Sequence, residues 1–257
     1  MRTARITALG ALALFVTMPV WGGFFDDKPQ PRLVMFIGVD QSGSFLKGPD
    51  FDDSIQFLSH YIYGHLKGLE GMTQPAALFV GSIGGDKKGE PKVFFPIETF
   101  QDKTPEEIEA KLREIFPKDH VDKYTDYNAF FQKVTEMVKD RNMVLKPLAV
   151  VMVSDGMLDV PGNHGRHDFR GIDLSPLEKL SRNVTVRLLY TDPTVGKKWE
   201  GQVPRRRVKV WTQEAPVMET WKDPKIYNPD GPMEKQDKFI RWVKNNVDFG
   251  VRMKRVD

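Results

Sequence analysis

Short, almost continuously apolar runs recur along this chain, separated by longer segments in which apolar residues recur every three or four positions. The runs at 32–39, 76–83, 147–153 and 183–190 are typical of strands buried on both faces. The spacing over 55–69 is that of an amphipathic helix. Alternating strands and helices predict an α/β fold, a doubly wound and mostly parallel sheet with helices on both faces.

Two segments indicate where the sheet and its helices end. The run 92–99 follows a Gly-rich turn and contains Pro96, which predicts one antiparallel edge strand. Thr104, Pro105 and Glu107 form the signature of a helix N-terminus, namely a capping hydroxyl, a proline in the first turn and a reciprocal capping carboxylate. We expect this helix to reach 116, further helices over 127–141, 175–182 and 233–247, and a last strand at 205–212.

Composition narrows the range of functions. The chain is 40% hydrophobic and 28% charged, with a formal net charge of +3 and no cysteine. The lack of cysteine excludes disulfides, thiolate metal sites and cysteine nucleophiles. With so small a net charge, nucleic acid is not an expected partner, and we interpret Arg205–Arg207 as basic residues beside an edge strand.

The N-terminal segment differs from the rest of the chain in its long uncharged stretch. Arg2 and Arg5 precede the uncharged stretch 6–20, which predicts a signal peptide over 1–23 and a periplasmic or secreted bacterial protein. The alternative is an uncleaved anchor, because the uncharged stretch extends through Phe25 and then has about the length that spans a bilayer. Only in that case do we expect membrane association.

Oxygen-bearing side chains follow two of the predicted strands. Asp40, Ser42 and Ser44 come directly after the first strand, and Asp155 comes two residues after the apolar run 147–153. Because the carboxyl ends of parallel strands meet at one edge of a sheet, Asp40 and Asp155 are expected to be neighbours in space. Carboxylates and hydroxyls suit a hard divalent cation.

With one further segment, these residues resemble the metal-ion-dependent adhesion site of von Willebrand factor A-type (vWA) domains. The D-x-S-x-S motif of that family is matched by Asp40, Ser42 and Ser44. The threonine that precedes a helix is matched by Thr125, and the aspartate of the third loop by Asp155.

The resemblance implies a vWA-like domain over 32–250 and a function. The serine hydroxyls would bind Mg²⁺ directly, the two aspartates directly or through water, and Thr125 would join when a ligand is bound. An Asp or Glu side chain of a partner protein would complete the coordination. Mn²⁺ or Ca²⁺ accept the same oxygen ligands. The implied molecule is a protein–protein interaction module and not an enzyme.

Residues around these loops are candidates for partner contacts. Asp126 follows Thr125, and His164 and His167 lie in a Gly-rich loop after Asp155, so we assign all three to a partner-binding rim. Trp199 lies in the polar segment "GKKWEGQ". We expect it in a loop, as an exposed aromatic contact or packed over the sheet edge.

Two other functions remain open. Asp40 could act as the nucleophile of a metal-dependent phosphohydrolase, since haloacid-dehalogenase-like phosphatases also place an aspartate after an apolar strand. They require D-x-D there, however, and this chain has Ser42. The third candidate is a structural scaffold whose metal site is idle.

Overall fold

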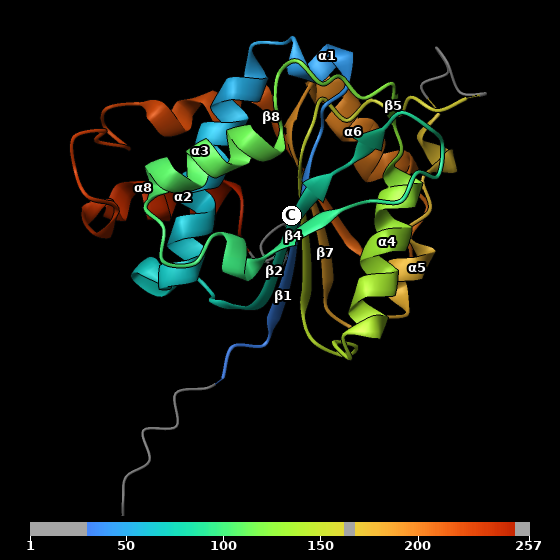
Figure 1. Cartoon of the computed structure of the whole chain (residues 1–257), viewed down its shortest axis with the longest axis horizontal. Helices are drawn as coiled ribbons and strands as arrows, with labels where there is room; N and C mark the ends of the chain where they lie inside the picture. The colour runs from blue at the N-terminus through green and yellow to red at the C-terminus, as the bar shows by residue number, and fades with distance from the viewer. Residues whose placement is uncertain (1–29, 162–167, 250–257) are drawn as a thin grey trace, which may run out of the picture. The chain divides into compact units, whose positions relative to one another are not determined.

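A central sheet with helices on both faces organises the chain (Figure 1). The computed structural model describes residues 30–161 and 168–249. The sheet has six strands, and all neighbouring strands run parallel except for one antiparallel edge strand, Phe94–Pro96. This confirms the predicted α/β fold. The strands are β1 (Leu33–Val39), β2 (Pro75–Ser82), β4 (Phe94–Pro96), β6 (Leu148–Val153), β7 (Val184–Thr191) and β8 (Lys209–Glu214).

Helices cover the two faces separately (Figure 1). One face carries α1 (Gly43–Leu46), α2 (Asp50–Lys67), α3 (Pro105–Ile115), α7 (Ala215–Met218) and α8 (Asp237–Asn246), and the other α4 (Tyr127–Asp140), α5 (Ser175–Glu178) and α6 (Pro193–Gln202). Two short strands, β3 (Gly84–Gly85) and β5 (Tyr124–Thr125), pair with each other outside the main sheet. Short 3₁₀ turns lie at Leu69–Gly71, Ile97–Thr99, Phe169–Gly171, Glu219–Lys222 and Met233–Lys235.

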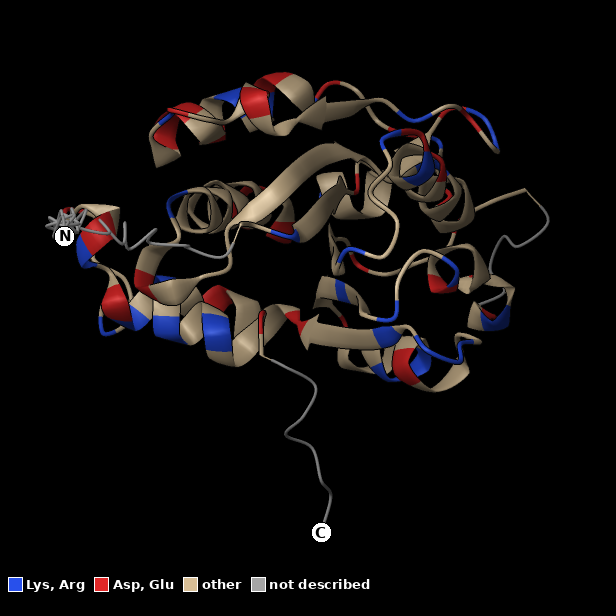
Figure 2. Cartoon of the chain, turned by 90° about the horizontal axis from the view of Figure 1, so that it is seen from below, with Lys and Arg blue, Asp and Glu red and all other residues tan. Residues whose placement is uncertain are grey.

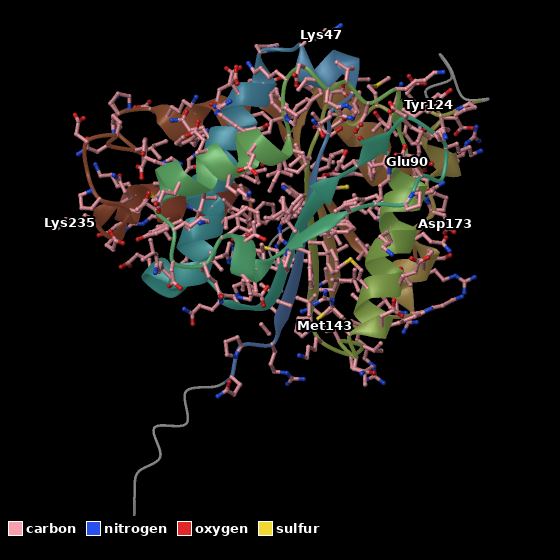
Figure 3. All side chains as sticks on the ribbon, viewed as in Figure 1. Lys47, Glu90, Tyr124, Met143, Asp173 and Lys235 are labelled. Atoms are coloured by element: carbon pink, nitrogen blue, oxygen red, sulfur yellow. The ribbon has the colours of Figure 1, made fainter. Side chains whose placement is uncertain are left out.

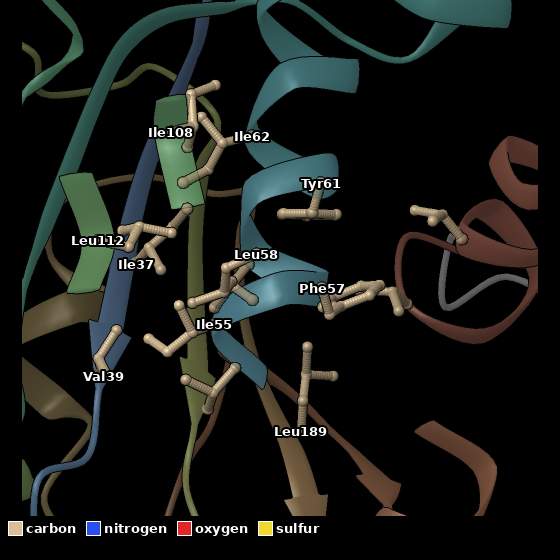
Figure 4. Packing of buried hydrophobic residues seen from close by; sticks show 14 of the residues in the cluster. Ile37, Val39, Ile55, Phe57, Leu58, Tyr61, Ile62, Ile108, Leu112 and Leu189 are labelled. Carbon is tan, nitrogen blue, oxygen red and sulfur yellow. The ribbon is translucent and has the colours of Figure 1, made fainter. Parts of the chain in front are cut away.

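The core consists of two layers that share the strands. On β1, Ile37 and Val39 face the layer with α2, α3 and α8, whereas Val34 and Phe36 face the layer with α4. Figure 4 shows Ile37 and Val39 beside the buried side chains of α2 and α3. A central strand with both faces buried has no position for a polar side chain until it ends. Figure 2 shows the same division, with charged residues mainly on helices and loops and largely uncharged central strands.

The order of the strands gives the sheet a switch point between β1 and β6. It reads β4-β2-β1-β6-β7-β8, so successive connections build outward in opposite directions from the β1–β6 pair. In open α/β sheets, ligands bind at the carboxyl ends of the strands at such a switch point. Val39 pairs with Val153 in parallel register, which brings the residues that follow both strands to the same level. This confirms that the two strand ends meet.

Local signals for helix ends have mixed outcomes. The Thr104 side chain caps α3 by accepting a hydrogen bond from the Glu107 backbone, and the Glu107 carboxylate accepts one from the Thr104 backbone, as predicted. The expected helix at 175–182 is shorter, because α5 ends at Glu178. The expected helix at 233–247 begins with a 3₁₀ turn before α8.

The predicted signal peptide lies outside the described residues, and the described residues from Pro31 onward belong to one compact unit. Within the described ranges, no helix has the length and apolar character needed to cross a membrane.

Candidate metal centre

Asp40 is the innermost residue of the site. It follows β1 and is fully buried. One carboxylate oxygen accepts a hydrogen bond from the Ser42 backbone at 2.8 Å, and the other accepts one from the Ser154 hydroxyl at 2.5 Å. The second bond joins the loop after β1 to the loop after β6, so the two strand ends hold a single carboxylate between them.

The second loop is held against both of the others. Ser42 forms a backbone bridge with Asp122, whose N–H donates to the Gln41 carbonyl at 2.9 Å. The Thr125 N–H donates to the Asp159 carbonyl at 2.9 Å. Backbone hydrogen bonds therefore tie the Thr125 loop to the loop of Ser42 on one side and to the loop of Asp155 on the other.

The two serine hydroxyls face each other. The Oγ atoms of Ser42 and Ser44 are 3.2 Å apart. Ser42 is buried, whereas Ser44 is exposed. Thr125 is 1% exposed and Asp155 is partly exposed, so the residues that resemble the adhesion site extend from a buried carboxylate to the surface.

The electrostatics of the site favour a cation. Burial, and next the nearby charge of Asp155, raise the pKa of Asp40 from its ordinary 3.8 to about 7, although hydrogen bonds from Ser154 and Ser42 lower it. Ion pairs between described residues include neither Asp40 nor Asp155. A bound cation would supply the positive charge that these side chains lack.

Sequence reasoning missed the residues that support Asp40. The Ser154 hydroxyl lies 2.7 Å from the Tyr127 hydroxyl and accepts a hydrogen bond from the Gly156 backbone at 3.0 Å. Tyr127 is buried, and burial together with the charges of Asp40 and Asp155 raises its pKa well above the ordinary value. Ser154 immediately precedes Asp155, and this hydroxyl at a strand end was the available signal.

Trp199 packs against the third loop, so its expected position in a loop and as an exposed contact was wrong, whereas the alternative of a packed side chain agrees with the structure. It lies in α6 rather than in a loop and is 0% exposed. Its indole N–H donates to the Gly156 carbonyl at 2.8 Å, and its ring contacts that of Tyr127 edge to face at 4.9 Å between centroids. Trp199 is therefore a packing residue under the site and not a surface contact.

Gly156 is required by the turn that positions Asp155. Its φ is +84°, and a Cβ atom there would lie 2.8 Å from Val195 Cγ1 and 3.2 Å from Trp199 Nε1. Both the left-handed backbone and the close packing exclude a side chain.

We expect Gly156→Ala to lower the free energy of unfolding by about 1–3 kcal/mol, because the turn becomes strained and α6 must move. Gly201→Ala is the control, since Gly201 lies in the same helix and nothing lies within 4 Å of an added Cβ. Urea unfolding of both variants measures the difference. Equal stability of the two variants would contradict this account of the turn.

Of the three residues assigned to the partner-binding rim, the structure describes only Asp126. Asp126 is buried and caps α4: one carboxylate oxygen accepts from the Ala129 backbone and the other from the Gly89 backbone, each at 3.0 Å. Its carboxylate thus holds a helix and a neighbouring loop. His164 and His167 lie outside the described residues.

A cavity and a buried lysine lie beside the second loop. The cavity, of about 760 Å³, is lined by residues that include Lys92, Asp126, Asn128 and Leu158. Lys92 is 7% exposed and donates to the Gly84 carbonyl. Burial lowers its pKa, whereas the charges of Asp122 and Asp126 raise it. The Lys92 ammonium group therefore lies next to the strand that pairs with Thr125, near the carboxylates of Asp122 and Asp126.

Comparisons with known proteins leave the family of this chain open. No family model matches it, and no curated protein matches it significantly. Two solved structures of proximal thread matrix protein 1 from the mussel byssus, one described with a zinc-occupied MIDAS motif, align with 73% and 74% of this chain at 12% and 14% identity, with TM-scores of 0.43 and 0.44. The human COPII-coat protein Sec24c aligns with 71% at 11% identity and a TM-score of 0.42.

The chain spans less than half the length of each of these proteins, 46% of the two mussel chains and 30% of Sec24c. Likenesses of this extent assign neither a family nor a function to the chain. What the site can do follows from its own side chains.

The donor set fits a hard divalent cation. Two carboxylates and three hydroxyls, all oxygen donors, come from three loops that hydrogen bonds hold together. Mg²⁺ prefers such ligands and usually keeps several waters. Among the described residues no group of three or more His, Cys, Asp or Glu side chains could hold a metal ion, so a cation bound here would depend on serine and threonine hydroxyls.

Proposed function

We propose that this chain is a metal-dependent protein-interaction module of the vWA type. Ser42, Ser44 and Thr125 would hold Mg²⁺ through hydroxyl oxygens, with Asp40 and Asp155 binding directly or through water. The cation would supply a Lewis-acidic position that attracts a carboxylate of a partner protein. The observation that carries the proposal is the pair of aspartates at the β1–β6 switch point: Asp40 is fully buried without an ion-pair partner among the described residues, and burial, and next the charge of Asp155, raise its pKa.

The surrounding residues have supporting roles in this proposal. Ser154 and the Ser42 backbone orient Asp40, and Trp199 fixes the turn that carries Asp155. Few charged ligands would surround the cation, which leaves it strongly attractive to an external carboxylate. The proposal places the module outside the cytoplasm, in the periplasm or secreted, because of the predicted signal peptide.

The proposal is tested first with the metal alone. We expect Mg²⁺ to bind the full chain in calorimetry and to raise its melting temperature by mass action. Asp155→Ala should abolish both effects. Asp140→Ala is the matched control, because Asp140 is an exposed residue at the far end of α4. An unchanged response of Asp155→Ala would exclude this site.

A second experiment identifies the function of the bound cation. Proteins retained from the cell envelope by immobilised chain with Mg²⁺, and released by EDTA, are expected to disappear with Asp155→Ala and to remain with Asp140→Ala. Metal-dependent stabilisation without any metal-dependent partner would instead favour the scaffold. Turnover of a generic phosphate ester that depends on Asp40 would favour the phosphohydrolase.

A further inference from the structure

Basic residues gather at the end of the sheet opposite the candidate metal centre. Arg32 directly precedes β1, Lys146 lies two residues before β6, and Arg182 lies two residues before β7. The parallel register aligns the starts of these three neighbouring strands. Arg141 follows α4 at the same end. We call Arg32, Arg141, Lys146 and Arg182 the basic edge.

The charges of Arg32, Lys146 and Arg182 are available to a partner, whereas the Arg141 guanidinium lies over the Phe79 ring, 5.0 Å from its centroid. Arg32, Arg141 and Arg182 are exposed and Lys146 is partly exposed. None of the four forms an ion pair with another described residue. Arg206 and Arg207 differ in having a carboxylate beside them: Glu178 accepts hydrogen bonds from both backbones, and these bonds, together with the charges of the two arginines, lower its pKa.

An apolar tip projects from the same end. Val144 and Leu145, in the connection from α4 to β6, are 41% and 75% exposed. Among the described residues only Val93 and Val121 are other large hydrophobic residues with exposed side chains. Leu145 has a φ of 72°, and its N–H donates to the Leu180 carbonyl at 2.8 Å. A bulky residue rarely adopts this conformation, and here it belongs to an exposed leucine.

Hydrogen bonds place the tip beside the basic edge. The Val34 N–H donates to the Pro147 carbonyl at 2.9 Å, so the residues that follow the tip pair with the start of β1. Figure 3 labels Met143, next to Val144, near the end of the molecule where β1 begins, whereas Lys47 and Tyr124 mark the end with the candidate metal centre. Basic side chains and an apolar tip thus form one surface.

We propose that the basic edge and the Val144–Leu145 tip dock onto an anionic lipid surface. Unpaired Lys and Arg attract anionic headgroups, and a short apolar tip enters the boundary between headgroups and acyl chains. A nucleic acid would use the charges but leave Leu145 in water. The candidate metal centre would then face away from the membrane, toward a partner. This inference does not depend on metal binding, because it uses none of the metal-centre residues.

The test uses the absence of cysteine from the chain. Leu145→Cys in the full chain allows a single environment-sensitive fluorophore at the tip, and Val93→Cys gives the matched control at another exposed apolar position, 70% exposed. We expect a blue shift for the label at 145 with vesicles of phosphatidylglycerol and phosphatidylcholine, but no shift with phosphatidylcholine alone. The label at 93 should not respond to either.

The contribution of charge is measured in the same labelled protein. Adding Arg182→Glu to Leu145→Cys should weaken the response to anionic vesicles at least fivefold, since one Lys or Arg near such a surface contributes about 1 kcal/mol. The proposal is overturned if the label at 145 stays in water, if both labels respond alike, or if uncharged vesicles give the same shift. A response that survives Arg182→Glu unchanged also overturns it.

Discussion

Replacing Asp40 by Asn is expected to stabilise the metal-free protein at pH 8 by about 4 kcal/mol. The reason is that the folded chain must bury an ionised Asp40 next to Asp155 when no cation is present. Its pKa is raised from 3.8 to about 7, and each unit of difference corresponds to about 1.4 kcal/mol. Asn keeps the shape of the side chain and can donate to Ser154, whose hydroxyl can in turn donate to Tyr127.

The pH dependence gives the sign of this effect. Between pH 4 and pH 7 the folded protein binds a proton at Asp40 that the unfolded chain has lost, so the free energy of unfolding falls as the pH rises. The proton bound to Asp40 makes its full contribution to the free energy of unfolding below about pH 4, and this contribution is lost once the pH passes about 7. Asn at position 40 does not titrate, so Asp40→Asn does not lose stability in this way as the pH rises. Its free energy of unfolding relative to the original chain should therefore grow by about 2–3 kcal/mol between pH 5 and pH 7.

Urea unfolding at several pH values in EDTA measures the difference. Asp192→Asn is the control, because Asp192 also follows a strand and caps α6, a role that Asn fills equally well. Parallel curves for the original chain and Asp40→Asn would show that Asp40 titrates normally, and the electrostatic argument for a cation would fail. With Mg²⁺ at pH 8, the order should reverse, since only the original chain retains the ligand.

The sequence predicts well what depends on periodicity and on general sheet geometry. β1 and β6 are recognisable because a strand buried on both faces must be apolar throughout. That Asp40 and Asp155 meet follows from the parallel arrangement alone. The capping box of α3 is predictable because Thr104 and Glu107 interact within a single turn.

Pairings between distant segments could not be predicted in this way. Thr125 is positioned by β3, which pairs with β5, and no local pattern marks two glycines as a strand. The bond between Ser154 and Tyr127 joins residues on different elements. The helical position of Trp199 did have a local signal, because Asp192 and Pro193 cap and begin α6, whereas the sparse apolar spacing of that helix suggested a loop.

Replacing Trp199 by Ala should lower the free energy of unfolding by about 3–5 kcal/mol, the usual cost of removing a buried aromatic ring. The indole is 0% exposed and contacts the rings of Tyr127 and Phe169. Its loss also leaves the Gly156 carbonyl without its hydrogen bond, which alone costs about 1–3 kcal/mol. Trp199→Phe keeps most of the packing and should lose only this second contribution.

The milder variant separates general stability from support of the metal centre. Trp221→Phe is its counterpart in the other core layer: Trp221 is 0% exposed, and its indole donates to Asp53 at 3.1 Å. Both variants remove one indole hydrogen bond, from Trp199 to the Gly156 carbonyl or from Trp221 to the Asp53 carboxylate, but only Trp199 holds the turn next to Asp155. The rise in melting temperature produced by Mg²⁺ should therefore be reduced in Trp199→Phe and preserved in Trp221→Phe. An equal response of both would show that Trp199 stabilises the fold without positioning the third loop for the cation.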